Sequence, residues 1–369
     1  MSSSSLRVGI VGLPNAGKST LFNALLKKQV AEMANYPFTT IEPNVGVVPV
    51  PDIRLERLAQ MVEHDEHVMP PIVPAVVQFV DIAGLVKGAS EGQGLGNKFL
   101  SHIREVDIIC HVIRFFPDPS VIHVAGDVDP GRDREIIETE LVLADLQTLA
   151  KQAEPKGAAD KVTKARWEII KRLIEQLNKG TLAKTVVMDP EEKELIGDLQ
   201  LLTMKPMLYV GNVSEQQLSS LGRFPESENF DSGNLKEKII AISAKTESEL
   251  ASLAPDEQKA YLAELGLKAS GLDRLIQKAY ETLGLVSFLT QGVKEVRAWT
   301  IEKGMKAPQA SGVIHTDFEK KFIKAETIGF EELMVIGGWK KAKEMGKLRF
   351  EGKDYIVQDG DIIEFKIGT

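Results

Sequence analysis

The sequence has one cysteine, Cys110, in 369 residues. A single cysteine excludes an intramolecular disulfide framework and a zinc site built from cysteines. The surrounding segment "DIICHVIRF" has the character of a buried strand. A thiol in that setting is better interpreted as an inert part of the core than as a redox sensor.

Long apolar runs and a positive net charge are also missing. No window approaches about 18 uninterrupted apolar residues, and "MSSSSLRVGI" lacks a basic segment followed by a long apolar stretch. We therefore expect a cytoplasmic protein without a membrane partner. The net charge of −8 gives no general attraction to nucleic acid, and DNA is not an expected partner. From Val286 onward 14 Lys and Arg accompany 13 Asp and Glu, so the preceding part carries −9 and is not expected to be the main nucleic-acid-binding face.

What the sequence does contain is an alternation of strand-like and helix-like segments. Its hydrophobic content of 43% is enough for packed cores in two or three domains. Strands are expected at "LRVGIV", "AVVQFVDI" and "VDIICHVIRFF", and again at "KPMLYVGNV" and "EKIIAISA". Because helical stretches separate these strands, residues 6–129 and 203–285 are predicted to form one α/β domain with a doubly wound sheet.

Residues 130–202 interrupt that domain with apolar residues at helical spacing. The predicted buried faces consist of Ile136, Leu143, Leu146 and Ala150 on a first helix, and Ala165, Ile169, Leu173 and Leu177 on a second. A break at "AEPKGAAD" separates them, so the segment predicts an antiparallel helical hairpin. Its charged outer face suits a solvated arm and a partner-binding surface equally.

Residues 286–369 predict a small, mostly β domain, after a closing helix at "GLDRLIQKAYETLGL". The segments "EVRAWTI", "FIKAETI" and "KDYIVQDGDIIEFKI" alternate apolar and polar residues, as strands with one buried face do. "QDGD" is predicted to be the turn between the last two strands.

The segment "GIVGLPNAGKST" has the spacing of a phosphate-binding loop between a strand and a helix. Backbone amides of the loop and of the first helical turn are expected to surround the phosphates. Lys18 is predicted to reach the β and γ oxygens as the catalytic charge, and the Ser19 hydroxyl to bind Mg²⁺. The nucleotide-binding residues expected here are Asn15, Ala16, Gly17, Lys18, Ser19 and Thr20.

Two later segments have the pattern of loops that sense the γ-phosphate. "NYPFTTIEPN" contains Thr39 and Thr40, of which Thr40 is the residue predicted to complete the Mg²⁺ shell. "DIAGLVKGASEGQGLGN" supplies Asp81-x-x-Gly84. Asp81 is predicted to hold Mg²⁺ through water, and the Gly84 amide to contact the γ-phosphate during catalysis. Five glycines from Gly84 to Gly96, both included, leave this loop free to rearrange.

Leu85 occupies the position at which Ras-type switch proteins carry a glutamine that orients the attacking water. Leucine cannot do this, so water must be positioned otherwise, or hydrolysis must wait for a partner or an ion. Asn15 offers one compensation, because its carbonyl could help to hold K⁺ beside the phosphates; it is equally suited to be a turn residue. His123, in "DPSVIHVAG", is a second candidate, either as a catalytic residue that positions water or as a structural histidine.

These segments, together with "NVSE", "GVIHTDFEKKFIKAE" and "DYIVQDGDIIEFK", resemble the Obg-like ATPase family, also called YchF. The resemblance runs from about Leu6 to Lys366. It implies a Ras-like P-loop domain with an inserted helical coiled-coil hairpin and a C-terminal TGS domain, which is ubiquitin-like (β-grasp) in fold. It also implies binding to the 70S ribosome and its large subunit, through rRNA and ribosomal proteins, and a preference for ATP over GTP.

The segment "LYVGNVSEQ" departs from the NKxD pattern with which guanine sites read their base. Glu215 replaces the aspartate, and its extra methylene displaces the carboxylate by about 1.5 Å, enough to spoil a bidentate geometry. Val213 replaces the lysine. We expect Asn212 to contact N7 of the purine and the Val213 backbone to read the N6/N1 edge of adenine. The segment from Ser243 to Glu247 is expected to support the base from its other side.

A run of basic residues lies near the C-terminus, in "GWKKAKEMGKLRF". It contains Lys340, Lys341, Lys343, Lys347 and Arg349, with Trp339 and Phe350 beside them. Basic residues interleaved with aromatic ones suit phosphate contacts and base stacking on RNA. The same run is also compatible with an ordinary solvated face.

Taken together, these motifs predict an Mg²⁺-dependent ATPase that acts as a slow nucleotide switch on the ribosome. One alternative is a GTP-preferring ribosome-assembly factor. Another is a non-enzymatic scaffold or stress regulator in which ATP only holds one conformation, an interpretation that Leu85 favours. A metabolic kinase fits less well, because no phosphoacceptor pocket is recognisable and a switch loop would have no use in it.

Overall fold

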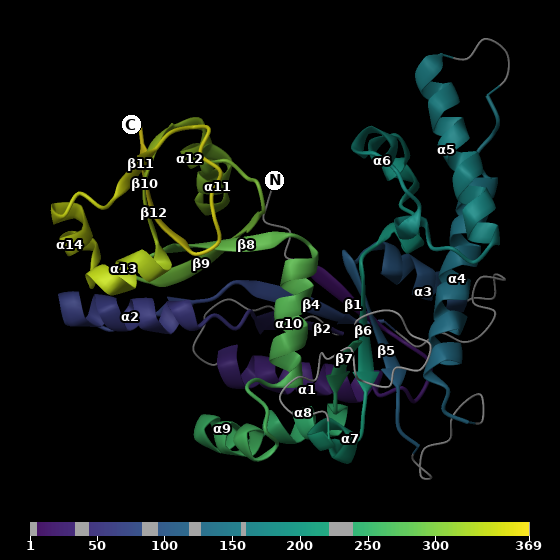
Figure 1. Ribbon diagram of the computed structural model, residues 1–369, viewed down its shortest axis with the longest axis horizontal. Coiled ribbons are helices and arrows are strands. Elements are labelled where there is room, and N and C mark those ends of the chain that lie inside the picture. The colour runs from purple at the N-terminus through teal and green to yellow at the C-terminus, as the bar shows by residue number, and fades with distance from the viewer. Residues whose placement is uncertain are drawn as a thin grey trace.

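Two six-stranded sheets contain the strands of the computed structural model, which describes residues 6–33, 44–82, 95–117, 127–155, 160–220 and 239–368. The first sheet lies at the centre of Figure 1 and has the order β2-β4-β1-β5-β6-β7. Only β2 is antiparallel to its neighbour. The strands are β1 (Arg7–Val11), β2 (Val45–Pro49), β4 (Val76–Asp81), β5 (Ile108–Arg114), β6 (Met207–Asn212) and β7 (Ile239–Ile242).

Helices cover both faces of this sheet, which confirms the predicted doubly wound α/β domain. On one face, α1 (Lys18–Met33) and α10 (Gly271–Thr282) share a core with the strands. On the other, α3 (Leu95–Arg104) and the first half of α4 (Pro130–Ala150) do so. The strand β5 is buried at every residue, as a central strand between two helical layers must be. Three short helices, α7 (Glu215–Ser220), α8 (Ala244–Leu250) and α9 (Pro255–Glu264), complete the domain.

The helical insertion extends away from the sheet, at the right of Figure 1. It consists of α4, α5 (Lys161–Asn178), α6 (Pro190–Ile196) and three short 3₁₀ turns. On α5 the predicted face is buried except for Ala165. On α4 the prediction is wrong, because Leu143 is 40% exposed and Ala150 is exposed as well. This helix buries one face against the sheet and another against α5, so its apolar residues do not follow a single stripe.

The second sheet forms the C-terminal domain, at the upper left of Figure 1, with the order β11-β10-β12-β8-β9-β3. Its C-terminal strands are β8 (Leu285–Thr290), β9 (Val296–Glu302), β10 (Phe322–Gly329), β11 (Arg349–Glu351) and β12 (Asp361–Ile367). The order β9-β8-β12-β10-β11, with β8 parallel to β12, is that of a β-grasp fold. The helices are α11 (Ala307–Ile314), α12 (Thr316–Lys320), α13 (Phe330–Ile336) and α14 (Trp339–Glu344).

The strand expected at "KDYIV" is not present, and "QDGD" does not join two paired strands. Instead the Val357 amide donates to the Met305 carbonyl and the Ala307 amide to the Tyr355 carbonyl. The Asp361 carboxylate also accepts from the Tyr355 hydroxyl and the Gln358 amide. The two backbone bonds tie the segment to residues 305–307, and the two bonds to Asp361 hold it at the start of β12, where it does not form a strand paired with β12.

One segment of the nucleotide domain connects two strands of the first sheet and contributes a strand to the second. Between β2 and β4 the chain forms α2 (Ile53–Glu66) and β3 (Ile72–Val73), and β3 pairs with β9 of the C-terminal domain. Buried apolar residues of α2 share a core with residues of β8, β10 and β12. Arg54 reinforces this contact, because its guanidinium binds Asp52 at 2.8 Å and Asp359 at 2.7 Å. The two domains are therefore joined by a common core, which the sequence patterns did not predict.

Over the described ranges, every helix is too short or too polar to cross a membrane.

Candidate nucleotide-binding site

The loop between β1 and α1 depends on two glycines for its path. Gly12 and Gly17 have φ angles of 155° and 98°. A Cβ on Gly12 would lie 2.4 Å from the Val112 carbonyl oxygen, and one on Gly17 would lie 2.1 Å from Asn212 Nδ2. Larger residues would therefore displace the loop from the ends of β5 and β6. Asn15, which is exposed, also has a left-handed φ of 64°, a conformation that asparagine tolerates.

Lys18 begins α1 and is buried, with Nζ donating to the Leu13 carbonyl at 2.8 Å. Burial lowers the pKa of Lys18, and the negative charge of Asp81 opposes that effect. Burial likewise raises the pKa of Asp81, and Lys18 opposes it. Lys18 at the start of α1 and Asp81 at the end of β4 are thus close enough for their charges to interact. An anion bound beside Lys18 would restore the favourable interactions that its ammonium loses on burial.

The groups available for a metal ion are hard oxygen donors. Ser19 and Thr20 are exposed in the first turn of α1, and Asp81 is half-buried in register with Ile10 of β1. A hydroxyl and a carboxylate suit Mg²⁺, which usually keeps several waters and shares its remaining positions with substrate phosphates. The described part of the chain contains no cluster of three or more His, Cys, Asp or Glu side chains able to hold a metal alone. The residues present therefore fit a metal that arrives with a nucleotide.

Asn212 connects the predicted phosphate loop to the segments that are expected to bind the base. Its Nδ2 donates to the Ala16 carbonyl at 2.9 Å, and its Oδ1 accepts from the Ala244 amide at 3.1 Å. The side chain is buried at the end of β6. Only one of the two Nδ2 hydrogens is needed for Ala16, so the other remains for N7 of a purine. This second role of Asn212, as a tie between distant loops, was not part of the sequence prediction.

The Val213 backbone can offer a base a hydrogen-bond acceptor but no donor. Its N–H donates to the Ile242 carbonyl at 2.9 Å, which leaves its own carbonyl oxygen as the group for an edge of the base. An acceptor matches the N6 amino group of adenine and opposes O6 of guanine. The buried Val213 side chain packs with Leu218 and Leu267.

Glu215 does not resemble the carboxylate of a guanine site in its placement. It begins α7, is exposed, and accepts a hydrogen bond of 3.3 Å from the Tyr261 hydroxyl of α9. Ser214 and Gln217 hold this turn, because the Ser214 amide donates to Gln217 Oε1 at 2.9 Å. Tyr261 is a residue that the sequence did not single out, since nothing in the local pattern connects α9 with the base segment.

Ser243 is buried and acts as the N-cap of α8, where its hydroxyl accepts from the Thr246 amide at 3.3 Å and the Thr246 hydroxyl at 2.9 Å. Its place beside Asn212 follows from the bond between Asn212 and Ala244. Glu247, the other end of the expected base support, accepts instead from the Gly271 amide at 2.7 Å and the Leu272 amide at 3.3 Å. It therefore caps α10, the helix that leads into β8.

Burial raises the pKa of Glu247 to about 7, against the hydrogen bonds from α10 that favour its charged form. The folded protein consequently binds a proton more tightly than the unfolded chain does, so the penalty for a charged Glu247 is absent below about pH 4.5 and grows until about pH 7. We therefore compare the free energies of unfolding of the wild type and of Glu247→Gln. The wild-type value minus the variant value is expected to fall by up to about 3 kcal/mol as the pH rises from 5 to 8.

Urea unfolding at several pH values measures this difference. Glu249→Gln, on the same helix but largely exposed, provides the control and should show no comparable trend. A difference that stays constant across this pH range would rule out the titration of Glu247.

Five residues of the sequence prediction lie outside the described residues. They are Thr39, Thr40, Gly84, Leu85 and His123. The described residues of the prediction do converge: the loop residues 15–20, Asp81, Asn212, Val213 and Ser243 all lie at the carboxyl ends of the parallel strands or directly after them. Ligands of open α/β sheets bind at this edge.

Comparison with known proteins gives matches along the whole chain. A family model described as a 50S ribosome-binding GTPase matches residues 7–143, and one named for the C-terminal domain of YchF GTPases, described as a protein of unknown function, matches residues 285–368. The "Ribosome-binding ATPase YchF" of Bacillus subtilis is 48% identical, with 99% of this chain and 100% of the relative covered. The protein of the same name from Escherichia coli O157:H7 is 47% identical, with 97% and 98% covered. A solved structure of the Schizosaccharomyces pombe YchF GTPase superimposes with a TM-score of 0.85 at 38% identity, with 99% of both chains covered.

Proposed function

The chain belongs to the YchF family, and from this membership we propose that it is a ribosome-binding nucleotide hydrolase that cleaves ATP to ADP and phosphate with Mg²⁺. The observation that carries the proposal is the phosphate loop itself, with a buried Lys18 opposite Asp81 and a direct tie from Ala16 to Asn212. Together these observations support a site for phosphate, metal and base at one edge of the sheet. Both bacterial relatives named above are described as ribosome-binding ATPases.

In the proposed reaction the residues of this protein act mainly by binding and orienting the nucleotide and the metal. Lys18 leaves the Leu13 carbonyl for the β and γ oxygens, where its charge stabilises the transition state. Ser19 and Asp81 would hold the metal, which supplies further charge neutralisation at the phosphates. Water then attacks the γ-phosphate in line with the leaving oxygen. Thr40 and the Gly84 amide are proposed to sense the γ-phosphate and to be released once it leaves.

The attacking water still needs an orienting group, because Leu85 cannot supply one. Two residues are proposed to compensate, one by holding an ion beside the phosphates and the other by acting on the water. Asn15 is exposed at the phosphate loop, where its carbonyl would hold K⁺ beside the phosphates, and His123 would act on the water directly. The two proposals differ in their dependence on the monovalent cation.

Preference for ATP is proposed to arise at Val213 and Glu215. The Val213 carbonyl accepts from the adenine amino group and faces an acceptor in guanine, while Glu215 is engaged with Tyr261. An unmatched buried polar group costs roughly 1–3 kcal/mol, so ATP should bind about ten to a hundred times more tightly than GTP. GTP that binds more tightly than ATP in isothermal titration would contradict this account of the base site.

The experiment that tests the function is hydrolysis of ATP and GTP side by side, in K⁺ and in Na⁺, with and without ribosomes. We expect slow ATP turnover that ribosomes raise, faster than GTP turnover in each condition. A further rise in K⁺ over Na⁺ would assign Asn15 its ionic role, and its absence would favour His123. Tight ATP binding with no hydrolysis under any condition would instead indicate a scaffold that uses ATP as a structural ligand.

Only part of the basic run near the C-terminus is available on the surface for a partner. Lys340 is bound to Glu66 at 2.8 Å, and Arg349 pairs with Asp361 and Glu351, each at 3.3 Å. Trp339 is half-buried against the core that the two domains share. What remains exposed for RNA phosphates is Lys341, Lys343 and Lys347, with Phe350 nearby and 63% exposed.

We propose that these three lysines contact the ribosome. Replacing Lys341 and Lys343 together by glutamate should weaken ribosome binding by about tenfold at low salt and reduce its salt dependence. Sedimentation with ribosomes over a range of KCl concentrations measures both effects. The double variant of Lys303 and Lys320 to glutamate carries the same charge change on exposed residues of the same domain. An equal loss of binding in the two variants would show that only the overall charge of the domain matters.

A further inference from the structure

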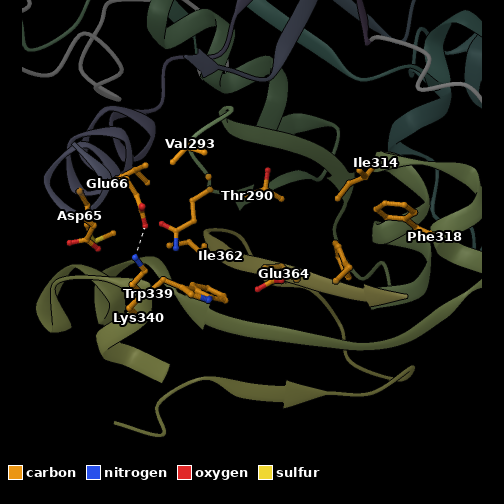
Figure 2. Close-up of a pocket in the computed structure, with 16 residues that line it drawn as sticks. Asp65, Glu66, Thr290, Val293, Ile314, Phe318, Trp339, Lys340, Ile362 and Glu364 are labelled. Atoms are coloured by element: carbon orange, nitrogen blue, oxygen red, sulfur yellow. Dashed lines mark ion pairs between the residues drawn. The ribbon is translucent and has the colours of Figure 1, made fainter. Parts of the chain in front are cut away.

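A cleft lies at the seam between α2 and the C-terminal domain (Figure 2), and none of the residues predicted for the nucleotide site lines it. Its volume is about 330 Å³, enough for a few side chains of a partner. The C-terminal turn of α2, the segment after β8, the start of α14 and the strand β12 form its walls. Both domains thus contribute to one cavity.

One wall of the cleft is the edge of β12. This strand pairs with β8 at a single position, Ile362 with Leu289. β8 then ends at Thr290, whereas β12 continues to Ile367. Within the described residues, β12 therefore has β10 on one side and no strand partner on the other beyond Ile362. An unpaired edge of this kind accepts an additional strand through backbone hydrogen bonds.

The charged residues of the lining are mainly acidic. Asp65, Glu66 and Glu364 lie in it, against Lys340 alone, which is already bound to Glu66 at 2.8 Å. Glu364 is 52% exposed, and Lys366, with which it pairs, lies outside the lining and also approaches Glu326. These carboxylates repel phosphate and attract ammonium or guanidinium groups.

The apolar residues of the lining are unevenly placed. Figure 2 shows Asp65 and Glu66 at one end of the cleft, Ile314 and Phe318 at the other, and Ile362 and Glu364 between them. Trp339 lies beside Lys340 near the acidic end. This arrangement suits a peptide with a basic side chain at the acidic end of the cleft and a large apolar side chain at the end formed by Ile314 and Phe318.

We propose that this cleft binds an extended basic peptide segment of a partner protein, which adds a strand to the free edge of β12. Its backbone pairs with β12, its lysine or arginine side chains meet the carboxylates of Glu364 and the end of α2, and its apolar side chain contacts Phe318. The charge of the lining disfavours an RNA strand, which sets this surface apart from the exposed lysines of α14. Because α2 leads back to β2 and β4, an occupant would also touch the nucleotide domain.

Fluorescence anisotropy of the full-length protein with labelled peptides tests the proposal. The first probe is a peptide of alternating arginine and valine, and the second has glutamate in place of arginine. The third is the arginine peptide with every second backbone nitrogen methylated, which removes the donors that strand pairing needs. We expect the first to bind, the second not to bind, and the third to bind at least about tenfold more weakly than the first.

Two matched variants locate the binding. Glu364→Lys should weaken the arginine peptide by at least about tenfold. Glu302→Lys makes the same charge change on an exposed residue that pairs with Leu285, at the opposite end of β8, and should change the affinity by less than about twofold. Equal effects of the two variants, or equal binding of the methylated and unmethylated peptides, would overturn the proposal. Binding of labelled oligouridine to the wild-type protein as tightly as the arginine peptide, with each displacing the other, would overturn the proposal and identify the surface as one for RNA.

Discussion

Replacing Lys18 by alanine is expected to lower ATP turnover by at least about a thousandfold, which corresponds to roughly 4 kcal/mol of transition-state stabilisation. The expectation rests on the position of the ammonium. Lys18 is buried at the start of α1, its pKa is lowered by that burial, and its ammonium donates to the Leu13 carbonyl and interacts with the charge of Asp81. Once the ammonium has moved from the Leu13 carbonyl to the phosphates of the bound nucleotide, it need not reorganise further as charge develops in the transition state.

The measurement is single-turnover hydrolysis at saturating ATP, together with unfolding curves that establish an intact fold. Lys27→Ala is the matched control, because Lys27 lies on the same helix and donates to Ser248 and Ser252, away from the phosphate loop. It should retain turnover within about threefold, as expected for a group outside the site. Wild-type turnover in the Lys18 variant would remove the phosphate-site assignment altogether.

The parts of the site that could be predicted from the sequence are those whose geometry is local. The phosphate loop needs glycine at Gly12 and Gly17 because neighbouring atoms exclude a Cβ there, and Lys18 follows at once as the first residue of a helix. Spacing along the chain expresses all of this. The same holds for β5, whose mainly apolar segment predicted a buried strand.

What could not be predicted depends on which distant segments meet. The bond from Asn212 to Ala16 spans 196 positions in the sequence, and the contact of Tyr261 with Glu215 joins two helices that no periodicity relates. The face of α4 was misjudged for a similar reason, since a helix packed on two sides no longer shows one apolar stripe. The segment at Tyr355 alternates like a strand but is tied to residues 305–307 instead.

The core shared by the two domains is a further feature that local sequence patterns could not predict. The apolar residues of α2 could be expected to face a core, but nothing in their spacing says that this core includes β8, β10 and β12. The consequence concerns function, because α2 lies between β2 and β4, the strands that adjoin the two predicted switch segments. The C-terminal domain is thereby in contact with the helix that connects the strands next to these two segments.

Replacing Asn212 by alanine is expected to weaken binding of both ATP and GTP by at least about a hundredfold while leaving their ratio nearly unchanged. Two buried groups, the Ala16 carbonyl and the Ala244 amide, lose their partner in this variant, and each loss costs about 1–3 kcal/mol. The purine would also lose its contact at N7, an atom that adenine and guanine share. Isothermal titration with both nucleotides gives the two affinities and their ratio.

Inorganic tripolyphosphate separates the two roles of Asn212, because it has no base. If the side chain only reads N7, the variant should bind tripolyphosphate as the wild type does. The structure gives a different expectation: Asn212 fixes the Ala16 carbonyl, and a loop that loses this tie no longer directs its amides at the phosphates, so tripolyphosphate should also bind at least about tenfold more weakly. An unchanged tripolyphosphate affinity would show that the phosphate loop keeps its form without Asn212, and that the buried amide serves the base alone.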